Sequence, residues 1–76
     1  METDNRTFKE IYQSMDRYDQ KEFRQRVLKM SLVTESAFRN WALGNRVPEP
    51  VHQANIVRAL KSFCIVATPS TLFPAA

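Results

Sequence analysis

The chain has 76 residues, of which 43% are hydrophobic and 25% are charged, and its formal net charge is +3. A chain of this length forms one domain with one small core. It contains one cysteine and one histidine, which excludes an internal disulfide and leaves too few ligands for a Cys/His zinc site. The N-terminus lacks the apolar segment of a signal peptide, and no segment approaches the roughly 18 apolar residues of a membrane helix. We therefore expect a cytoplasmic protein that needs no cofactor or metal and contacts no membrane.

The charge is unevenly placed along the chain. Residues 1–22 contain four basic and six acidic side chains, whereas residues 23–63 contain seven basic and two acidic ones. A localised positive surface favours a polyanionic partner, although such a surface is often only solvated.

The first predicted helix follows a polar segment, residues 1–6, which we expect to be disordered. Thr7 and Glu10 have the spacing of a capping box, in which each side chain accepts a hydrogen bond from a free backbone N–H. Apolar residues at helical spacing follow, and they predict an amphipathic helix over 8–16.

A second capping box at Asp19 and Glu22 predicts a helix over about 20–30. Tyr18 and Phe23 have the spacing of a hydrophobic staple across this cap. The periodicity puts one set of side chains on the inner face, namely Phe23, Val27 and Met30. It puts another set on the outside, namely Arg24, Gln25 and Lys29.

The third predicted helix covers 35–43, with Thr34 as its N-cap. At 100° per residue its inner arc contains Phe38, Trp41 and Ala42. Gly44 then ends the helix, because the left-handed conformation at a helix C-terminus costs glycine little. The opposite, mostly polar arc contains Ser36, Arg39, Asn40 and Leu43.

A loop over 45–48 and a fourth helix over about 51–63 complete the predicted core. Residues 64–76 carry no charge and form a C-terminal extension. Within it, Cys64–Ala67 fits a short strand that pairs with a second copy across a two-fold axis, and a flexible tail follows. A helix or a loose tail fits the same residues.

The segment VTESAFRNWALGNRVP, residues 33–48, resembles the recognition-helix region of the lambda repressor and Cro-like helix-turn-helix family. Members of this family show an apolar residue, a Ser/Thr cap, a helix with a late tryptophan, then glycine, a basic residue and proline. The resemblance covers about residues 20–63. It implies an all-α, compact four-helix DNA-binding domain over 7–63. Leu32 stands where the family commonly has a glycine in the turn.

The resemblance implies a sequence-specific transcriptional regulator, repressor-like, that binds double-stranded DNA as a homodimer. Its recognition helix, about 35–43, would lie in the major groove, which is wide enough to admit one helix. Arg39 is suited to guanine and Asn40 to adenine, because each can form two hydrogen bonds with that base. The residues at positions that approach DNA in the family are Thr34, Glu35, Ser36, Arg39, Asn40, Asn45 and Arg46.

Two other functional classes are considered, a protein-interaction module and an enzyme. A protein-interaction module with the same fold is favoured by Leu43 on the polar arc and by the modest net charge. An enzyme is disfavoured, because no nucleophile, base and orienting group occur together and one glycine cannot form a phosphate-binding loop. We therefore expect no small-molecule substrate.

Overall fold

Side-chain caps start the first three helices of the computed structural model, which describes residues 3–74. Helix α1, Phe8–Ser14, begins with the predicted capping box between Thr7 and Glu10. Helix α3, Glu35–Leu43, begins where the Thr34 hydroxyl accepts a hydrogen bond from the Ala37 N–H at 3.2 Å. Both caps, and the bounds of the third predicted helix, are confirmed.

Helix α2, Arg17–Ser31, starts earlier than the sequence predicts, because α1 ends at Ser14 and leaves a very short link. Its cap is Asp16, whose carboxylate accepts a hydrogen bond from the Asp19 N–H at 2.7 Å. Asp19 is therefore a first-turn residue, and the predicted cap at this position is wrong. The predicted staple is wrong as well, since Tyr18 is 71% exposed.

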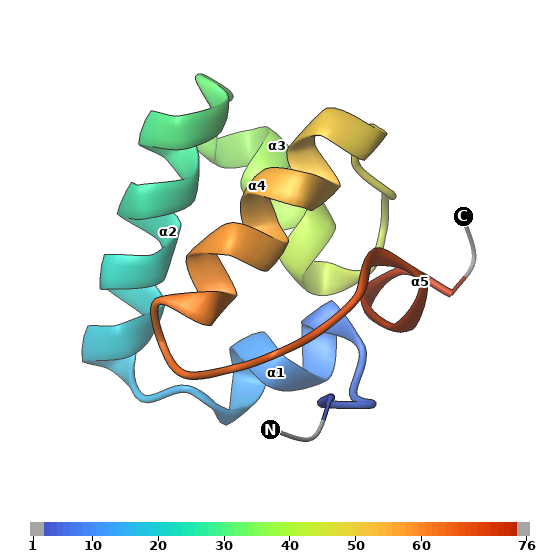
Figure 1. The fold of residues 1–76 in the computed structure, drawn as a ribbon. Coiled ribbons are helices and arrows are strands. Elements are labelled where there is room, and N and C mark those ends of the chain that lie inside the picture. The colour runs from blue at the N-terminus through green and yellow to red at the C-terminus, as the bar shows by residue number, and fades with distance from the viewer. Residues whose placement is uncertain (1–2, 75–76) are drawn as a thin grey trace.

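The chain after α4, Pro50–Lys61, differs most from the prediction. No strand occurs within residues 3–74, so the expected dimerisation strand at Cys64–Ala67 is absent. The segment instead runs extended across the molecule and ends in a short helix, α5, Pro69–Leu72 (Figure 1). Leu72 and Phe73 are buried in the core, so the tail is part of the fold up to that point.

The N-terminal segment is also held in place where the structure describes it. The Asp4 N–H donates to the Val66 carbonyl oxygen at 2.6 Å, and the Asp4 carboxylate pairs with Arg6 at 2.7 Å. Residues 3–6 are thus ordered, contrary to the prediction for 1–6. Residues 1–2 and 75–76, the ends of the two segments predicted to be disordered, lie outside the described residues.

An aromatic cluster joins all parts of the chain in one core. The Phe8 ring lies 5.6–6.1 Å, centroid to centroid, from four other rings: Tyr12, Phe23, Phe38 and Phe73. Phe63, at the end of α4, packs edge-on against Phe23 at 5.8 Å. Because every phenylalanine of the chain is in this cluster, the five helices within residues 3–74 depend on the same buried apolar surface.

The fold places α3 on one side of the molecule, behind α4 in the view of Figure 1. Helix α2 packs chiefly on α4, and α1 packs chiefly on α3. A three-residue turn, 32–34, connects α2 to α3. None of the helices within residues 3–74 has the length and hydrophobicity to cross a bilayer.

Candidate nucleic-acid interface

Helix α3 has one buried face and one exposed face, as its periodicity predicts. Phe38, Trp41 and Ala42 are 1%, 7% and 6% exposed. The Trp41 ring also stacks at 5.3 Å on His52, which lies in the first turn of α4. A nine-residue helix is marginal alone, so this buried arc is what fixes α3 to the domain and orients its outer face.

The C-terminus of α3 is closed by a Schellman motif. The Gly44 N–H donates to the Trp41 carbonyl oxygen at 3.2 Å, and the Asn45 N–H donates to that of Asn40 at 2.9 Å. Gly44 has a φ of 81°, in the left-handed region. The Arg46 N–H also donates to the Asn40 carbonyl oxygen at 3.3 Å, so the loop residues are tied to the helix that precedes them.

The predicted site residues fall into two groups on either side of the exposed ridge of α3. Glu35 and Arg39 line a hollow toward α1 and α2. Asn40 and Arg46 line a shallower hollow toward α4, together with His52. Arg39 and Asn40 are 100° apart around the helix axis, so their side chains point to different sides of the exposed face and do not lie next to each other.

The remaining predicted residues have simpler surroundings. Thr34, Ser36 and Asn45 are all exposed. The Thr34 hydroxyl oxygen caps α3, which leaves its proton free to donate to another acceptor. Ser36 lies on the outer ridge of α3 and makes no side-chain hydrogen bond within residues 3–74.

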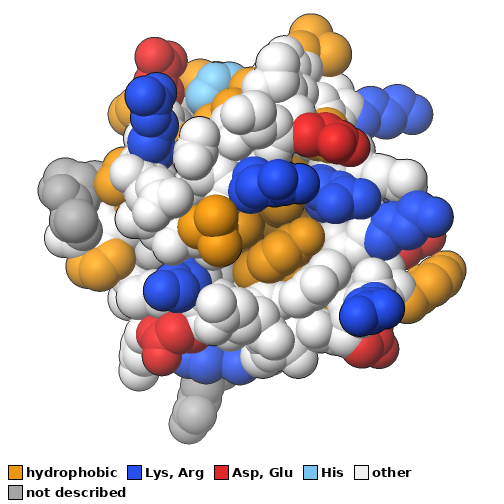
Figure 2. All heavy atoms as spheres, turned by 180° about the vertical axis from the view of Figure 1, so that it is seen from behind, with side chains coloured by type: hydrophobic (Ala, Val, Ile, Leu, Met, Phe, Trp, Pro, Cys, Tyr) orange, Lys and Arg blue, Asp and Glu red, His pale blue; other side chains and the backbone are white. Residues whose placement is uncertain are grey.

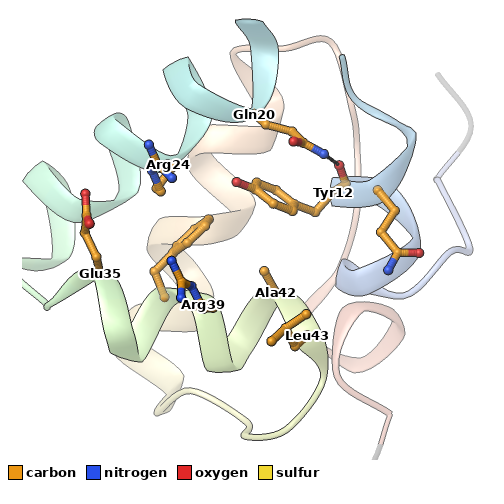
Figure 3. A pocket seen from close by; sticks show the side chains of 9 residues that line it. Tyr12, Gln20, Arg24, Glu35, Arg39, Ala42 and Leu43 are labelled. Carbon is orange, nitrogen blue, oxygen red and sulfur yellow. Dashed lines mark hydrogen bonds between the residues drawn. The ribbon is translucent and has the colours of Figure 1, made fainter. Parts of the chain in front are cut away.

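The hollow beside Arg39 has a volume of about 210 Å³ and is lined by residues of α1, α2 and α3. Figure 2, which views the molecule from the side of α3, shows a recessed apolar area with Lys and Arg side chains at its edge. The lining residues are Tyr12, Gln13, Gln20, Arg24, Glu35, Phe38, Arg39, Ala42 and Leu43. In the close-up, the Tyr12 side chain extends from α1 with its hydroxyl toward the α2 side, where Arg24 lies, and Arg39 lies on α3 (Figure 3).

The arginines of this surface have no acidic partner within residues 3–74. The one ion pair of this range joins Arg6 to Asp4, far along the chain from α3. Arg24, Arg39 and Arg46 are therefore available to an external anion. Glu35, which also lines the hollow, lies outside ion-pair distance of each of them.

Sequence periodicity placed Arg24 on the outside of its helix, and this is wrong. Arg24 is half-buried, and its Nε atom is buried without a hydrogen-bond partner among the described residues. Its spacing to Val27 and Leu28, three and four residues on, is the signal that puts it near the inner face. Tyr12 was missed for a different reason, because its ring is core while its hydroxyl end reaches the surface hollow.

The surface combines a helix with one exposed face, guanidinium groups without ion-pair partners and amide side chains, which suits it to hydrogen bonding with an anionic polymer. Within the described part of the chain, no group of His, Cys, Asp and Glu side chains is placed to bind a metal ion. Comparison of the chain with protein-family models, with curated proteins and with solved structures gives no match.

Proposed function

We propose that this domain binds double-stranded DNA sequence-specifically and regulates transcription, with α3 in the major groove. The observation that carries the proposal is the outer face of α3 and its following loop. It bears Arg39 and Arg46, neither of which is neutralised by an acidic side chain of the described chain, while the opposite face anchors the helix by Trp41. A helix of this kind can enter the groove without exposing core residues.

Each group of residues has a distinct part in the proposed complex. Arg39 and Asn40 lie on the helix and contact base edges from its two flanks. Arg46 and Asn45 lie in the loop after Gly44 and contact the sugar-phosphate backbone. The hydrogen bonds from the loop to Asn40 support this division, because they fix the position of the loop relative to the helix.

We propose further that the protein acts as a homodimer at a promoter and represses by occlusion. One nine-residue helix contacts few base pairs, so a two-fold site read by two copies supplies the specificity that one copy lacks. The dimer contact would lie outside Cys64–Ala67, which forms no strand and is part of the folded domain. Sedimentation of the complex with its selected duplex should give two protein chains per duplex, and one chain per duplex would contradict the dimer.

The test of DNA binding is selection from random duplexes, followed by anisotropy titrations at several salt concentrations. Arg39→Ala and Asn40→Ala should each weaken binding to the selected site by about 1–3 kcal/mol and change binding to scrambled DNA little. Arg46→Ala should weaken both almost equally and reduce the salt slope by about one.

Arg58→Ala is the matched control, since Arg58 is an exposed arginine on α4 that lines the groove between α2 and α4. It removes the same charge and should leave site binding nearly unchanged. Equal losses from Arg58→Ala and Arg39→Ala would show general charge attraction in place of reading by α3. Binding of no duplex by the folded wild type would contradict the proposal as a whole.

A protein-interaction module is the alternative, and one observation favours it. Leu43, on the outer face of α3, is 49% exposed and lines the apolar hollow, which DNA would leave partly unfilled. Under this alternative, Leu43→Lys abolishes partner binding. Under the DNA proposal, the added positive charge near the backbone keeps or raises affinity for DNA.

A further inference from the structure

We propose that the hollow between α1, α2 and α3 binds a small carboxylic acid with an apolar body. The carboxylate would lie against Arg24, Arg39 and the Tyr12 hydroxyl, and the apolar body would lie on the floor formed by Phe38, Ala42 and Leu43. This goes beyond the proposed DNA binding, because the ligand would bind the free protein.

The polar wall of the hollow provides the first argument. The buried Nε of Arg24 has no hydrogen-bond partner in the described chain, and buried polar atoms in folded proteins are almost always paired. The Tyr12 hydroxyl likewise makes no hydrogen bond within residues 3–74. Burial raises the pKa of Tyr12, with Arg24 lowering it in part, so the hydroxyl carries its proton at neutral pH and can donate. The Tyr12 hydroxyl and the guanidinium groups of Arg24 and Arg39 thus line one hollow, and none of them forms a side-chain hydrogen bond within residues 3–74 (Figure 3).

The fixed position of the wall provides the second argument. The Gln20 side-chain amide donates to the Tyr12 carbonyl oxygen at 2.8 Å, which joins α2 to α1 at the end of the hollow. The Tyr12 ring packs edge-on against Phe38 at 5.4 Å and so cannot turn away. A hydroxyl on a ring held in this way loses little freedom when a ligand arrives.

The charge and size of the hollow select the ligand. Two guanidinium groups against the single carboxylate of Glu35 leave a net positive lining, which favours a singly charged anion. The volume of about 210 Å³ is below the roughly 300–1,000 Å³ of pockets for drug-sized ligands. The apolar part of the lining, where Leu43 is 49% exposed, distinguishes the site from one for inorganic phosphate, which would leave Leu43 uncovered.

The experiment is titration of the wild-type protein with phenylacetate, followed by calorimetry and by amide and methyl chemical shifts. A ligand of this size with ordinary efficiency binds with a Kd of about 1 mM. Shift changes should centre on Tyr12, Ala42 and Leu43. Acetate, which lacks the apolar body, and phenethylamine, which replaces the carboxylate by a cation, should each bind at least about tenfold more weakly.

Two variants test the wall, and neither needs DNA. Arg24→Met keeps the aliphatic stem and removes the guanidinium, and it should weaken phenylacetate binding about tenfold or more. Arg26→Met is the matched control, because Arg26 is exposed on the same helix and lies outside the hollow. Tyr12→Phe removes only the hydroxyl, and it keeps the test valid should Arg24→Met fail to fold.

Several outcomes would overturn the proposal. Equal binding of phenylacetate and phenethylamine would show an apolar hollow with no carboxylate site. Inorganic phosphate that binds at least as tightly as phenylacetate and changes the same chemical shifts would show an anion site to which the apolar lining contributes nothing. Unchanged binding by both Arg24→Met and Tyr12→Phe would place the ligand elsewhere. DNA binding is measured separately, so its failure leaves these results interpretable.

Discussion

The ends of α3 and α4 reverse the chain by the same hydrogen bonds but with different residues at the critical position. After α3, Gly44 adopts a φ of 81°. After α4, Cys64 adopts a φ of 62°. The Cys64 N–H donates to the Lys61 carbonyl oxygen at 3.1 Å, and the Ile65 N–H donates to that of Leu60 at 3.0 Å. This pair repeats the Schellman pattern seen at the end of α3.

The two helix ends lead into segments with different burial. Residues 45–47, directly after Gly44, are exposed, whereas the chain after Cys64 crosses the molecule and buries Ala67, Leu72 and Phe73. A left-handed non-glycine residue costs roughly 1–2 kcal/mol. At Cys64 the apolar burial further along the chain is large enough to offset that cost. Where the next segment is an exposed loop, as after α3, glycine keeps the cost low.

Removal of residues 69–76 should cause the largest loss of stability. It leaves the end of α4 intact and removes the buried segment that follows it. Losing Leu72 and Phe73 from the core should cost about 5 kcal/mol or more, which is comparable with the whole stability of a small domain. Circular dichroism at 25 °C should therefore show an unfolded chain. Deletion of Ala75 and Ala76 alone is the control. A truncated chain that melts like the full one would show that the burial downstream of Cys64 is unimportant.

Trp41→Ala should lower the free energy of unfolding by about 3–5 kcal/mol, because it removes the main anchor of α3. Thermal or urea denaturation measures this loss. Leu43→Ala is the control on the exposed face of the same helix and should cost under about 1 kcal/mol. Similar losses from the two substitutions would mean that the end of α3 is held by its cap and not by its core contacts.

Gly44→Ala should destabilise the domain by about 1 kcal/mol, through the backbone alone. The space for a side chain exists, since a Cβ at Gly44 would meet its nearest neighbour, Lys9 Cδ, at an ordinary 3.7 Å. The measurement is the midpoint of urea unfolding. An unchanged midpoint would contradict the view that glycine is needed where the following loop is exposed.

Cys64→Gly should have the smallest effect and the opposite sign. Relief of the left-handed strain, less the greater freedom of glycine in the unfolded chain, should raise stability by about 0.5 kcal/mol. Cys64→Ser separates backbone from side chain, because serine has the same strain and should leave the unfolding midpoint where it is in the wild type. A gain from serine equal to that from glycine would indicate a side-chain effect.

The turn between α2 and α3 also contains a left-handed residue that is not glycine, and its conformation could not be predicted from its residue type. Leu32 has a φ of 54° although it is 89% exposed, and its N–H donates to the Leu28 carbonyl oxygen at 2.9 Å. The Leu32 backbone adopts the conformation that glycine would favour. The left-handed conformation is unfavourable for leucine, so residue type argues against this turn. The hydrogen bond from Leu32 to Leu28 is nevertheless formed.

Local sequence determined the elements whose signals lie within a few residues. The caps at Thr7 and Thr34, the bounds of α3 and its end at Gly44 depend on hydrogen bonds between near neighbours, so the sequence predicts them. The burial of Phe38 and Trp41 follows from the 3.6-residue period of the same helix. The exposed positions of Ser36 and Arg39 follow from that period as well.

Tertiary structure decided the choices in which several local patterns fit equally. Asp16 and Asp19 are both good caps, and the short link after α1 selects Asp16. The uncharged segment after Cys64 fits a strand, a helix or a tail, and the unfilled apolar surface beside Phe8 selects an extended chain ending in a helix. The hollow that brings Tyr12, Arg24 and Arg39 together depends on three helices at once. No spacing along the chain encodes it, because side chains from distant residues meet only when the core fixes the distances between helices.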